Sequence, residues 1–363
     1  MEDLATELAE SDDLILIDVR RPEELEEAGQ IEGATHVQLE TFVDQQDLWP
    51  ADLDANIVIY CKAGVRGNIA ATILRTYGYT NVRNLKGGFD AWVEAGNPIV
   101  GGLDLDTAFQ TFLDDMEGYG VISVESLNEA LAEEPPFLLD VREVSEVEEN
   151  GYIEGTNALI PLRELGKNID KLPAFDRAVV VYCGSGWRSA IAMTALEAMG
   201  WTDVKSMTGG FGAWTGAGLP AAPGLPAEAE VLNIAAPDPA VLAAVDEMLV
   251  NLPEGWGVLP VEDLATELAE GGDLILIDVR RPEEVEESGL IEGAIRIPLE
   301  EFIALMADWP ADLDANIVVY CKVGHRGNIA ATILRTYGYT NIRNLRGGFD
   351  AWVAGGYEAA MPE

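Results

Sequence analysis

The stretch "YCKAGVRGNIAATILRTYGY", from Tyr60 to Tyr79, joins an apolar run to a helical pattern through a loop that carries a lone cysteine. The residues 57–60 predict a buried strand, and apolar residues at helical spacing from Asn68 predict a helix that ends at Gly78. A continuous apolar strand of this kind is typical of a parallel sheet with both faces covered. The cysteine loop is therefore predicted to lie where a strand of an α/β fold ends.

Nearly the same stretch recurs at Tyr320, because the chain contains three copies of one unit. Cys61 and Cys321 are 260 residues apart, and 39 of the 44 residues from Pro50 to Val93 are identical to those from Pro310 to Val353. A middle copy lies 122 residues after the first and has diverged almost everywhere else. The motifs that it still shares with the others are D-V-R, I-E-G, Y-C-x-x-G-x-R and G-G-F-x-A-W.

Each copy is predicted to be an α/β domain. In the first copy "LILIDV" and "NIVIYC" predict strands buried on both faces, and "NVRNL" predicts a short strand. The segment "RRPEELEEAG" predicts a short helix that begins at Pro22 and stops at Gly29, and "GGFDAWVEAG" predicts a closing helix. Strands that alternate with helices indicate a parallel sheet with helices on both faces.

The domain boundaries follow from the repeats and from the composition of the segments between them. We expect domains at 1–100, 119–222 and 256–363, joined by linkers at 101–118 and 223–255 that each contain a helix. The second linker is rich in Pro and Ala, which predicts an extended, semi-rigid segment. The first copy starts at "MEDL" without a counterpart of "GVLPV", so we expect its first edge strand and the helix before that strand to be missing. Either the start is truncated or a neighbouring domain fills the gap.

The charge of the chain excludes several kinds of partner. Asp and Glu total 64 and Lys and Arg total 22, which gives a net charge of −42. A field this negative argues against nucleic acid and against anionic membrane surfaces. The chain has no long apolar run that would predict a membrane span, and its acidic start is unlike a secretory signal, so we expect a cytoplasmic protein. A solubility surface and adaptation to high salt both remain open as reasons for the charge.

The three cysteines, Cys61, Cys183 and Cys321, are expected to act singly. An odd number at such wide spacing does not predict a disulfide framework, and no C-x-x-C pair predicts a metal site. A thiol is a nucleophile only as the thiolate, and here a helix start and nearby cations favour that form. A glycine in the loop also allows backbone N–H groups to converge on an anion. The residues of the three predicted anion cradles are Lys62, Gly64, Arg66, Gly186, Trp187, Arg188, Ser189, Lys322, Gly324, His325 and Arg326.

Taken together, these motifs resemble those of the rhodanese family of sulfurtransferases. The resemblance rests on Asp18-Val19-Arg20, Ile31-Glu32-Gly33-Ala34, the Cys61 loop and Gly87-Gly88-Phe89-Asp90-Ala91-Trp92, with their counterparts in the other copies. Four motifs in fixed order, three times over, make a specific signal. The resemblance implies three tandem domains, each a five-stranded, mostly parallel sheet flanked by helices.

The resemblance also implies a chemistry without a cofactor. Cys61, Cys183 and Cys321 would attack a small anionic donor such as thiosulfate and carry its sulfur as a persulfide to cyanide or a thiol. Arg66, Arg188 and Arg326 would hold the donor together with the loop N–H groups. Related-fold phosphatases use Cys-x5-Arg, whereas all three loops here are Cys-x4-Arg, which disfavours phosphoryl transfer. Two alternatives stay open, a persulfide carrier that passes sulfur to a protein partner and a non-enzymatic redox sensor or scaffold.

Other residues are predicted to support the loops or to face solvent. Asp18 with Arg20, and their counterparts Asp140, Arg142, Asp278 and Arg280, are expected to form structural ion pairs near strand ends. The glutamates between Glu23 and Glu27 are expected to be a solvated helix face. His325 either tunes the acidity of its loop or, as such loop side chains do more often, faces solvent. The family often has Ser after the loop arginine. Ser189 occupies this position in copy two, whereas Gly67 and Gly327 replace it in the other copies, which predicts weaker persulfide stabilisation there.

Overall fold

The computed structural model describes residues 4–5, 7–8, 14–95, 97, 99–100, 104–232 and 237–361 of the chain. Contacts divide the chain into two compact units, Met1–Asp104 with Asp238–Ala240, and Leu105–Pro237 with Val241–Glu363. The first unit contains the first copy, called domain 1, and the second contains domains 2 and 3. Residues 1–3, at the start of domain 1, lie outside the described residues, and so does any test there of the expected missing edge strand. Residues 96 and 98 of domain 1 and linker residues 101–103 also lie outside them.

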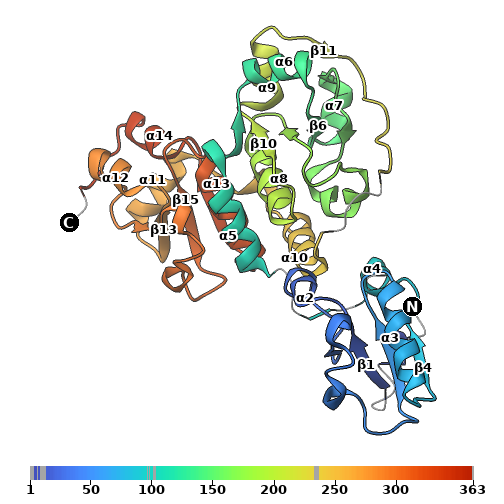
Figure 1. Cartoon of the computed structure of the whole chain (residues 1–363). Helices are drawn as coiled ribbons and strands as arrows, with labels where there is room; N and C mark the ends of the chain where they lie inside the picture. Colours follow the sequence, from blue (N-terminus) through green and yellow to red (C-terminus); the bar gives the residue numbers. More distant parts are fainter. Residues whose placement is uncertain are drawn as a thin grey trace. The chain divides into compact units, whose positions relative to one another are not determined.

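Domain 1, the blue part of Figure 1, is a parallel sheet. Its strand order is β2-β1-β3-β4. Its elements are β1 (Leu14–Asp18), α2 (Pro22–Ala28), β2 (Thr35–His36), η1 (Leu39–Thr41), η2 (Gln46–Leu48), β3 (Asn56–Tyr60), α3 (Val65–Thr76), β4 (Val82–Asn84) and α4 (Gly88–Glu94). Successive strand residues point to opposite faces of a sheet. Ile57 and Ile59 therefore lie in one apolar cluster with Leu74 of α3, and Val58 lies in another with Trp92 of α4. Both faces are buried, as the apolar runs predict.

Domain 2 is a five-stranded parallel sheet in the order β5-β10-β9-β6-β8, flanked by helices. Its elements are η3 (Glu117–Gly120), β5 (Val121–Ile122), α6 (Val124–Glu133), β6 (Phe137–Asp140), α7 (Val144–Asn150), β7 (Tyr152–Ile153), β8 (Ala158–Leu159), η4 (Leu162–Lys171), β9 (Val179–Tyr182), α8 (Trp187–Ala198), β10 (Val204–Met207), α9 (Gly210–Gly216) and β11 (Ala221–Ala222). Strands β7 and β11 form a separate antiparallel pair.

Domain 3 repeats this sheet in the order β12-β16-β15-β13-β14, again parallel throughout. Its elements are η5 (Glu254–Gly257), β12 (Val258–Leu259), α11 (Val261–Glu270), β13 (Leu274–Asp278), α12 (Pro282–Ser288), β14 (Ile295–Arg296), η6 (Leu299–Glu301), η7 (Met306–Asp308), β15 (Asn316–Tyr320), α13 (His325–Thr336), β16 (Ile342–Leu345) and α14 (Gly348–Ala354). The fold class predicted from the sequence, three tandem domains with parallel sheets and flanking helices, is confirmed.

The register of the two central strands brings two motifs together in each domain. In domain 1, Asp18 at the end of β1 is paired with Tyr60 at the end of β3. Asp140 is paired with Tyr182, and Asp278 with Tyr320, in the same way. Because these strands are parallel, the residues that follow them leave the same edge of the sheet. The D-V-R motif and the cysteine loop therefore lie side by side at that edge.

The helix after the cysteine loop begins earlier than the sequence pattern predicts. The apolar spacing predicts a start near Asn68, whereas α3 begins at Val65. Gly64 is its N-cap and has a φ of 92°, in the left-handed region that favours glycine. The chain therefore turns sharply at Gly64 and enters the helix at once, which places Arg66 in its first turn.

Domains 2 and 3 pack through the helices that follow their cysteine loops, α8 and α13 (Figure 1). The Asn328 side-chain amide of α13 donates to the Trp187 carbonyl of α8 over 2.8 Å. Helix α5 (Leu105–Asp115) packs on α8 and places Phe109 against Tyr337 of domain 3, with ring centres 6.0 Å apart. Helix α10 (Pro239–Val250) lies in the second linker.

This packing changes the surroundings of a nearly identical helix. Helices α3 and α13 differ at one position in twelve, where Val65 corresponds to His325. Ile69 of α3 is 50% exposed, whereas the corresponding Ile329 of α13 is fully buried. The cysteine loop of domain 3 therefore lies against a protein surface that is built from domain 2.

The last turn of this helix carries a different charge in domain 2. Arg75 and Arg335 donate to the carbonyls of Val82 and Ile342, at 2.6 and 2.7 Å. Glu197 takes their place in α8 and instead accepts from the Val204 N–H at 2.9 Å. Burial, with smaller effects of nearby carboxylates, raises the pKa of Glu197 to about 7.

This raised pKa predicts a pH-dependent loss of stability in the second unit. The native carboxyl keeps its proton at pH values where the unfolded chain, with a pKa near the ordinary ~4.3, has lost it. The free energy of unfolding should therefore fall as the pH rises from about 4.5 to 7, by up to about 3 kcal/mol from this one group. Denaturant melts of wild type and Glu197→Gln across this range measure the effect. The Gln variant should lose the Glu197 part of the slope, and an unchanged slope would contradict the assignment.

Candidate active sites in the cysteine loops

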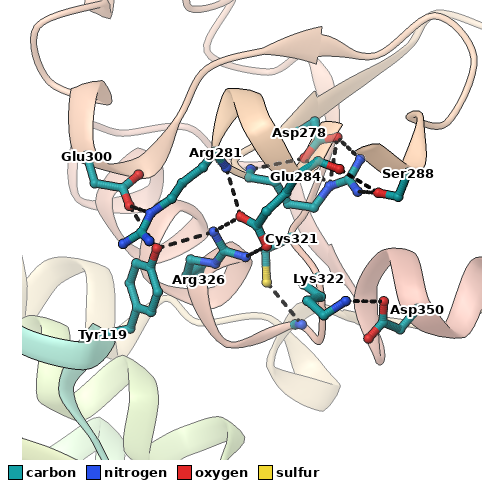
Figure 2. A network of polar contacts seen from close by, with 12 residues as sticks. Tyr119, Asp278, Arg281, Glu284, Ser288, Glu300, Cys321, Lys322, Arg326 and Asp350 are labelled. Carbon is teal, nitrogen blue, oxygen red and sulfur yellow. Dashed lines mark hydrogen bonds and ion pairs between the residues drawn. The ribbon is translucent and has the colours of Figure 1, made fainter. Parts of the chain in front are cut away.

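Each of the three cysteines is held in the same backbone cradle. The N–H of the glycine three residues later points at the cysteine Sγ, at 3.2 Å for Gly64, 3.2 Å for Gly186 and 3.1 Å for Gly324. These glycines have φ values of 92°, 92° and 102°, so a side chain at any of them would be strained. All three thiols are buried. Figure 2 shows the N–H contact at Cys321.

The residues of the G-G-F motif and the one after it bind the backbone of the cysteine loop through hydrogen bonds. In domain 1 the N–H groups of Phe89 and Asp90 donate to the carbonyls of Cys61 and Lys62, at 2.8 and 3.0 Å. Gly88 has a φ of 65°, and a Cβ on it would overlap both carbonyl oxygens. The same hydrogen bonds recur in domains 2 and 3, and a Cβ on Gly210 or Gly348 would likewise overlap the loop backbone. The second glycine of the motif is therefore required by the close approach of two backbones, beyond the tight turn that the sequence suggests.

The loop arginine does not lie free in any of the three sites. Arg66, Arg188 and Arg326 each make a two-pronged ion pair with a glutamate, with N–O distances between 2.5 and 2.7 Å; the partners are Glu24, Glu146 and Glu284. Such paired contacts fix the plane of a guanidinium as well as its position. The arginine therefore lowers the pKa of all three carboxyls, that of Glu24 to about 2.

These glutamates are site residues that the sequence analysis missed. The expectation that Glu23 to Glu27 form a solvated helix face is wrong for Glu24, because α2 turns this side chain toward Arg66. The signal was present in the sequence. Each copy has a glutamate six residues after the aspartate of its D-V-R motif. The other glutamates of α2 and α12 made this one position hard to single out.

The lysine after the cysteine contributes less than expected. Lys322 is exposed and its Nζ lies 3.1 Å from Asp350, as Figure 2 shows. Lys62 is likewise exposed. The positive groups next to the thiol are therefore the backbone N–H and the loop arginine, and domain 2 has Gly184 at the lysine position.

The D-V-R ion pairs expected from the sequence are present and buried. Arg20 donates to Asp18 through Nε and Nη2, at 2.6–3.0 Å, and also to the Gly29 carbonyl. Its guanidinium lies 3.8 Å from the centre of the Phe89 ring. The same pairs form at Asp140 with Arg142 and at Asp278 with Arg280. Each arginine thus ties the end of one strand to the turn that supports the cysteine loop.

The position after the loop arginine changes together with a residue on the next strand. Ser189 of domain 2 donates to the Gly186 carbonyl at 3.1 Å, and its hydroxyl lies 2.8 Å from that of Ser206 and 3.8 Å from Cys183 Sγ. Domain 1 has Gly67 and Asn84 at these two positions, and the Asn84 amide donates to the Gly64 carbonyl at 3.0 Å. A Cβ on Gly67 would overlap Asn84 Oδ1. The Gly–Asn pair of domain 1 and the Ser–Ser pair of domain 2 therefore fill the same space behind the loop. Each pair donates one hydrogen bond to the carbonyl of the loop glycine, from Asn84 in domain 1 and from Ser189 in domain 2.

Two other predicted loop residues turn toward the domain interface. His325 Nε2 donates to the Tyr119 carbonyl at 2.8 Å, and Trp187 Nε1 donates to the Trp256 carbonyl at 3.4 Å. The expectation that His325 faces solvent is therefore wrong, and its burial lowers its pKa. Val65 occupies this position in domain 1 and is 71% exposed.

The described residues contain no group of three or more His, Cys, Asp or Glu side chains placed to hold a metal ion. Within the same residues, no helix is long and apolar enough to cross a membrane.

Comparison with known proteins agrees with this geometry. A family model described as the Rhodanese-like domain matches residues 1–95, 123–217 and 261–355. A sulfurtransferase of Allochromatium vinosum is 36% identical over 102 residues, which are 28% of this chain and 92% of that protein. The human thiosulfate:glutathione sulfurtransferase is 33% identical over 98 residues, 24% of this chain and 84% of that protein.

Solved structures resemble the chain only loosely over its whole length. A thiosulfate sulfurtransferase from Pseudomonas aeruginosa is 19% identical, with a TM-score of 0.31 over 99% of this chain and 89% of that one. An anaerobic ergothioneine biosynthesis enzyme from Chlorobium limicola is 17% identical, with a TM-score of 0.32 over 100% and 99% of the two chains.

The paired positions behind the loop predict a compensated double variant. Gly67→Ser alone should destabilise the first unit by about 1–3 kcal/mol, because its Cβ overlaps Asn84. Adding Asn84→Ser should recover most of the loss, since it recreates the Ser189–Ser206 pair of domain 2. Denaturant melts of wild type, both single variants and the double variant measure the coupling. A harmless Gly67→Ser variant, or a double variant no better than the single one, would show that the two positions are independent.

Proposed function

The chain belongs to the rhodanese family and is a sulfurtransferase, and we propose that each of its three cysteines carries sulfur as a persulfide from a small anionic donor such as thiosulfate. The observation that supports this most directly is the glycine N–H that points at each Sγ, at 3.1–3.2 Å. A backbone donor fixed at this distance would stabilise negative charge that the sulfur carries during transfer. The same donor geometry occurs in domain 2, whose loop sequence differs most from the other two.

The proposed reaction has two displacement steps. The thiolate attacks the outer sulfur of thiosulfate, the bond between the two donor sulfurs breaks, and sulfite leaves with the electron pair. The enzyme then holds a cysteine persulfide anion. An acceptor, either cyanide or a thiolate, attacks the outer sulfur of the persulfide, and the electron pair of the broken bond returns to the cysteine. Each step exchanges one bond for another, so no outside oxidant or reductant is required.

The loop arginine would bind the donor while it is itself held in place. A guanidinium has five N–H donors, and the glutamate of each site uses two of them. In domain 3, Nη1 of Arg326 also donates to the Tyr119 hydroxyl at 3.4 Å. The other donors would hold the sulfite end of thiosulfate. The Glu24 contact and, to a smaller extent, the nearby Cys61 raise the pKa of Arg66, so the guanidinium stays charged at every relevant pH. The glutamate is therefore a positioning residue for the arginine.

The burial of the thiols favours small acceptors. Each cysteine is at most 1% exposed, so a bulky protein surface has no direct access to its Sγ. Cyanide or a small thiol fits this constraint better than a folded protein acceptor. The persulfide, which extends one sulfur atom beyond Sγ, is the form that an acceptor would meet.

Variants that keep one cysteine at a time test this function. We expect each Cys→Ser double variant, with only Cys61, Cys183 or Cys321 left, to form thiocyanate from thiosulfate and cyanide, and the triple variant to fall to the uncatalysed rate. The reason is that serine preserves the shape of the loop but does not supply a polarisable thiolate nucleophile. Initial rates over a range of thiosulfate concentrations give kcat and KM for each site.

Circular dichroism of the triple variant is the control for folding. A folded triple variant that keeps full activity would refute the cysteine mechanism. A wild-type chain that transfers no sulfur from thiosulfate would refute the proposed donor class.

A further inference from the structure

Two aromatic residues are held in a strained backbone conformation at the start of domains 2 and 3. Tyr119, with a φ of 62°, and Trp256, with a φ of 61°, are the non-glycine residues with positive φ in the described part of the chain. They lie in the matching sequences E-G-Y-G in η3 and E-G-W-G in η5. Bulky residues rarely adopt this conformation, and where they do the surrounding structure must hold them. The repetition indicates that the direction of the two rings matters.

Each ring lies against the loop arginine of the other domain. The centre of the Tyr119 ring is 4.8 Å from Cζ of Arg326 in domain 3, and the Trp256 ring is 5.3 Å from Cζ of Arg188 in domain 2. Figure 2 shows Tyr119 beside Arg326 and the Cys321 loop. A cation over an aromatic face at this distance is attracted to it. The contact is therefore reciprocal, since domain 2 supplies a ring to the Cys321 site and domain 3 supplies one to the Cys183 site.

The backbone of each aromatic residue is fixed by the same loop position. His325 donates to the Tyr119 carbonyl and Trp187 donates to the Trp256 carbonyl, both through a ring nitrogen. These two residues directly precede the loop arginines. Domain 1 has Val65 there, which has no side-chain donor. A ring donor thus occurs in the two loops that receive an aromatic partner.

A second arginine contacts each ring, and it comes from a different place in each domain. Arg281, at the N-cap of α12, lies 5.2 Å from the Tyr119 ring centre, and Arg163, in η4, lies 5.0 Å from the Trp256 ring centre. The two arginines are not at corresponding positions of the repeat, so duplication does not explain their common placement. The chain has only 22 basic residues against 64 acidic ones. Two arginines on one ring at each site are therefore a specific arrangement.

The rings also cover the loop arginines. The side chains of Arg188 and Arg326 are 10% and 8% exposed, compared with 26% for Arg66 of domain 1. All three arginines make the same ion pair with a glutamate. The lower exposure in domains 2 and 3 is thus associated with the ring contact. An interaction between charges strengthens as water is removed from around them.

We propose that domains 2 and 3 complete each other's active sites. Tyr119 is a positioning residue of the Cys321 site and Trp256 is a positioning residue of the Cys183 site. Each ring, with its two arginines, forms a subsite for the anionic end of the sulfur donor. This inference rests on the proposed function of the cysteines. It assigns Tyr119, at the start of domain 2, to the site of domain 3, and Trp256, at the start of domain 3, to the site of domain 2.

Site-resolved loading of the full-length chain tests this assignment. The chain is exposed briefly to thiosulfate, thiols and persulfides are trapped by alkylation, and the persulfide on the peptides of Cys61, Cys183 and Cys321 is measured by mass spectrometry. Tyr119→Asn should slow the loading of Cys321 about tenfold at low thiosulfate and leave Cys183 unchanged. Trp256→Asn should do the reverse. Both effects should shrink at saturating thiosulfate, because the subsite acts on donor binding.

The variants contain their own controls. Asparagine tolerates the left-handed backbone better than most residues, so the turn itself should survive. Cys61 lies in the other unit and its loading should stay at the wild-type rate in both variants. Tyr119→Phe removes the hydroxyl that donates to Glu300 at 2.8 Å and accepts from Arg326 at 3.4 Å. It keeps the ring, so if the ring carries the effect this variant should load Cys321 within about twofold of wild type.

Several results would overturn the proposal. One is slower loading of the wrong cysteine, Cys183 in Tyr119→Asn or Cys321 in Trp256→Asn. Equal slowing of Cys183 and Cys321, or no slowing at all, would also contradict it. So would a Tyr119→Phe variant that loads Cys321 as slowly as Tyr119→Asn. Failure of the proposed function has a different signature, because a wild-type chain would then load none of its cysteines.

Discussion

The hydrogen bond from a glycine N–H to the cysteine sulfur is the contact on which the rest of each domain depends. It forms only if the loop turns through a left-handed residue at Gly64, Gly186 or Gly324 and enters a helix at once. That turn needs support from behind, which the G-G-F motif provides through two N–H groups on the loop carbonyls. The support in turn depends on a glycine without a Cβ at the point where the two backbones meet. The shared motifs are thus parts of one constraint, the placement of a backbone N–H against the cysteine sulfur.

Each cysteine loop has a nearby positive charge, although the chain as a whole is strongly negative. The chain has a net charge of −42, yet each thiol lies near an arginine. That arginine is oriented by a glutamate, and a buried Asp–Arg pair fixes the neighbouring strand end. Buried ion pairs of this kind add specificity of position more readily than stability. The acidic surface and the positive sites are compatible, because the site charges are short-range and partly shielded from water.

The sequence predicted the parts of this account that depend on local patterns. Apolar runs predicted the strands, and the spacing of Cys61, Gly64 and Arg66 predicted the loop that places a backbone N–H against the cysteine Sγ. The start of α3 at Val65 was missed because a glycine cap, not apolar spacing, determines it. Glu24 was missed because the partner of Arg66 lies 42 residues away on another helix. The aromatic residues Tyr119 and Trp256 contact loop arginines across a domain interface, which periodicity within one domain does not reveal.

The central claim is that all three cradles hold a cysteine that accepts sulfur. The most direct measurement is the intact mass of the full-length chain after treatment with thiosulfate and removal of excess donor. The account predicts a species that is heavier by three sulfur atoms, and a return to the original mass when cyanide is added. A folded chain whose mass does not change with thiosulfate would contradict it, as would added sulfur that cyanide fails to remove.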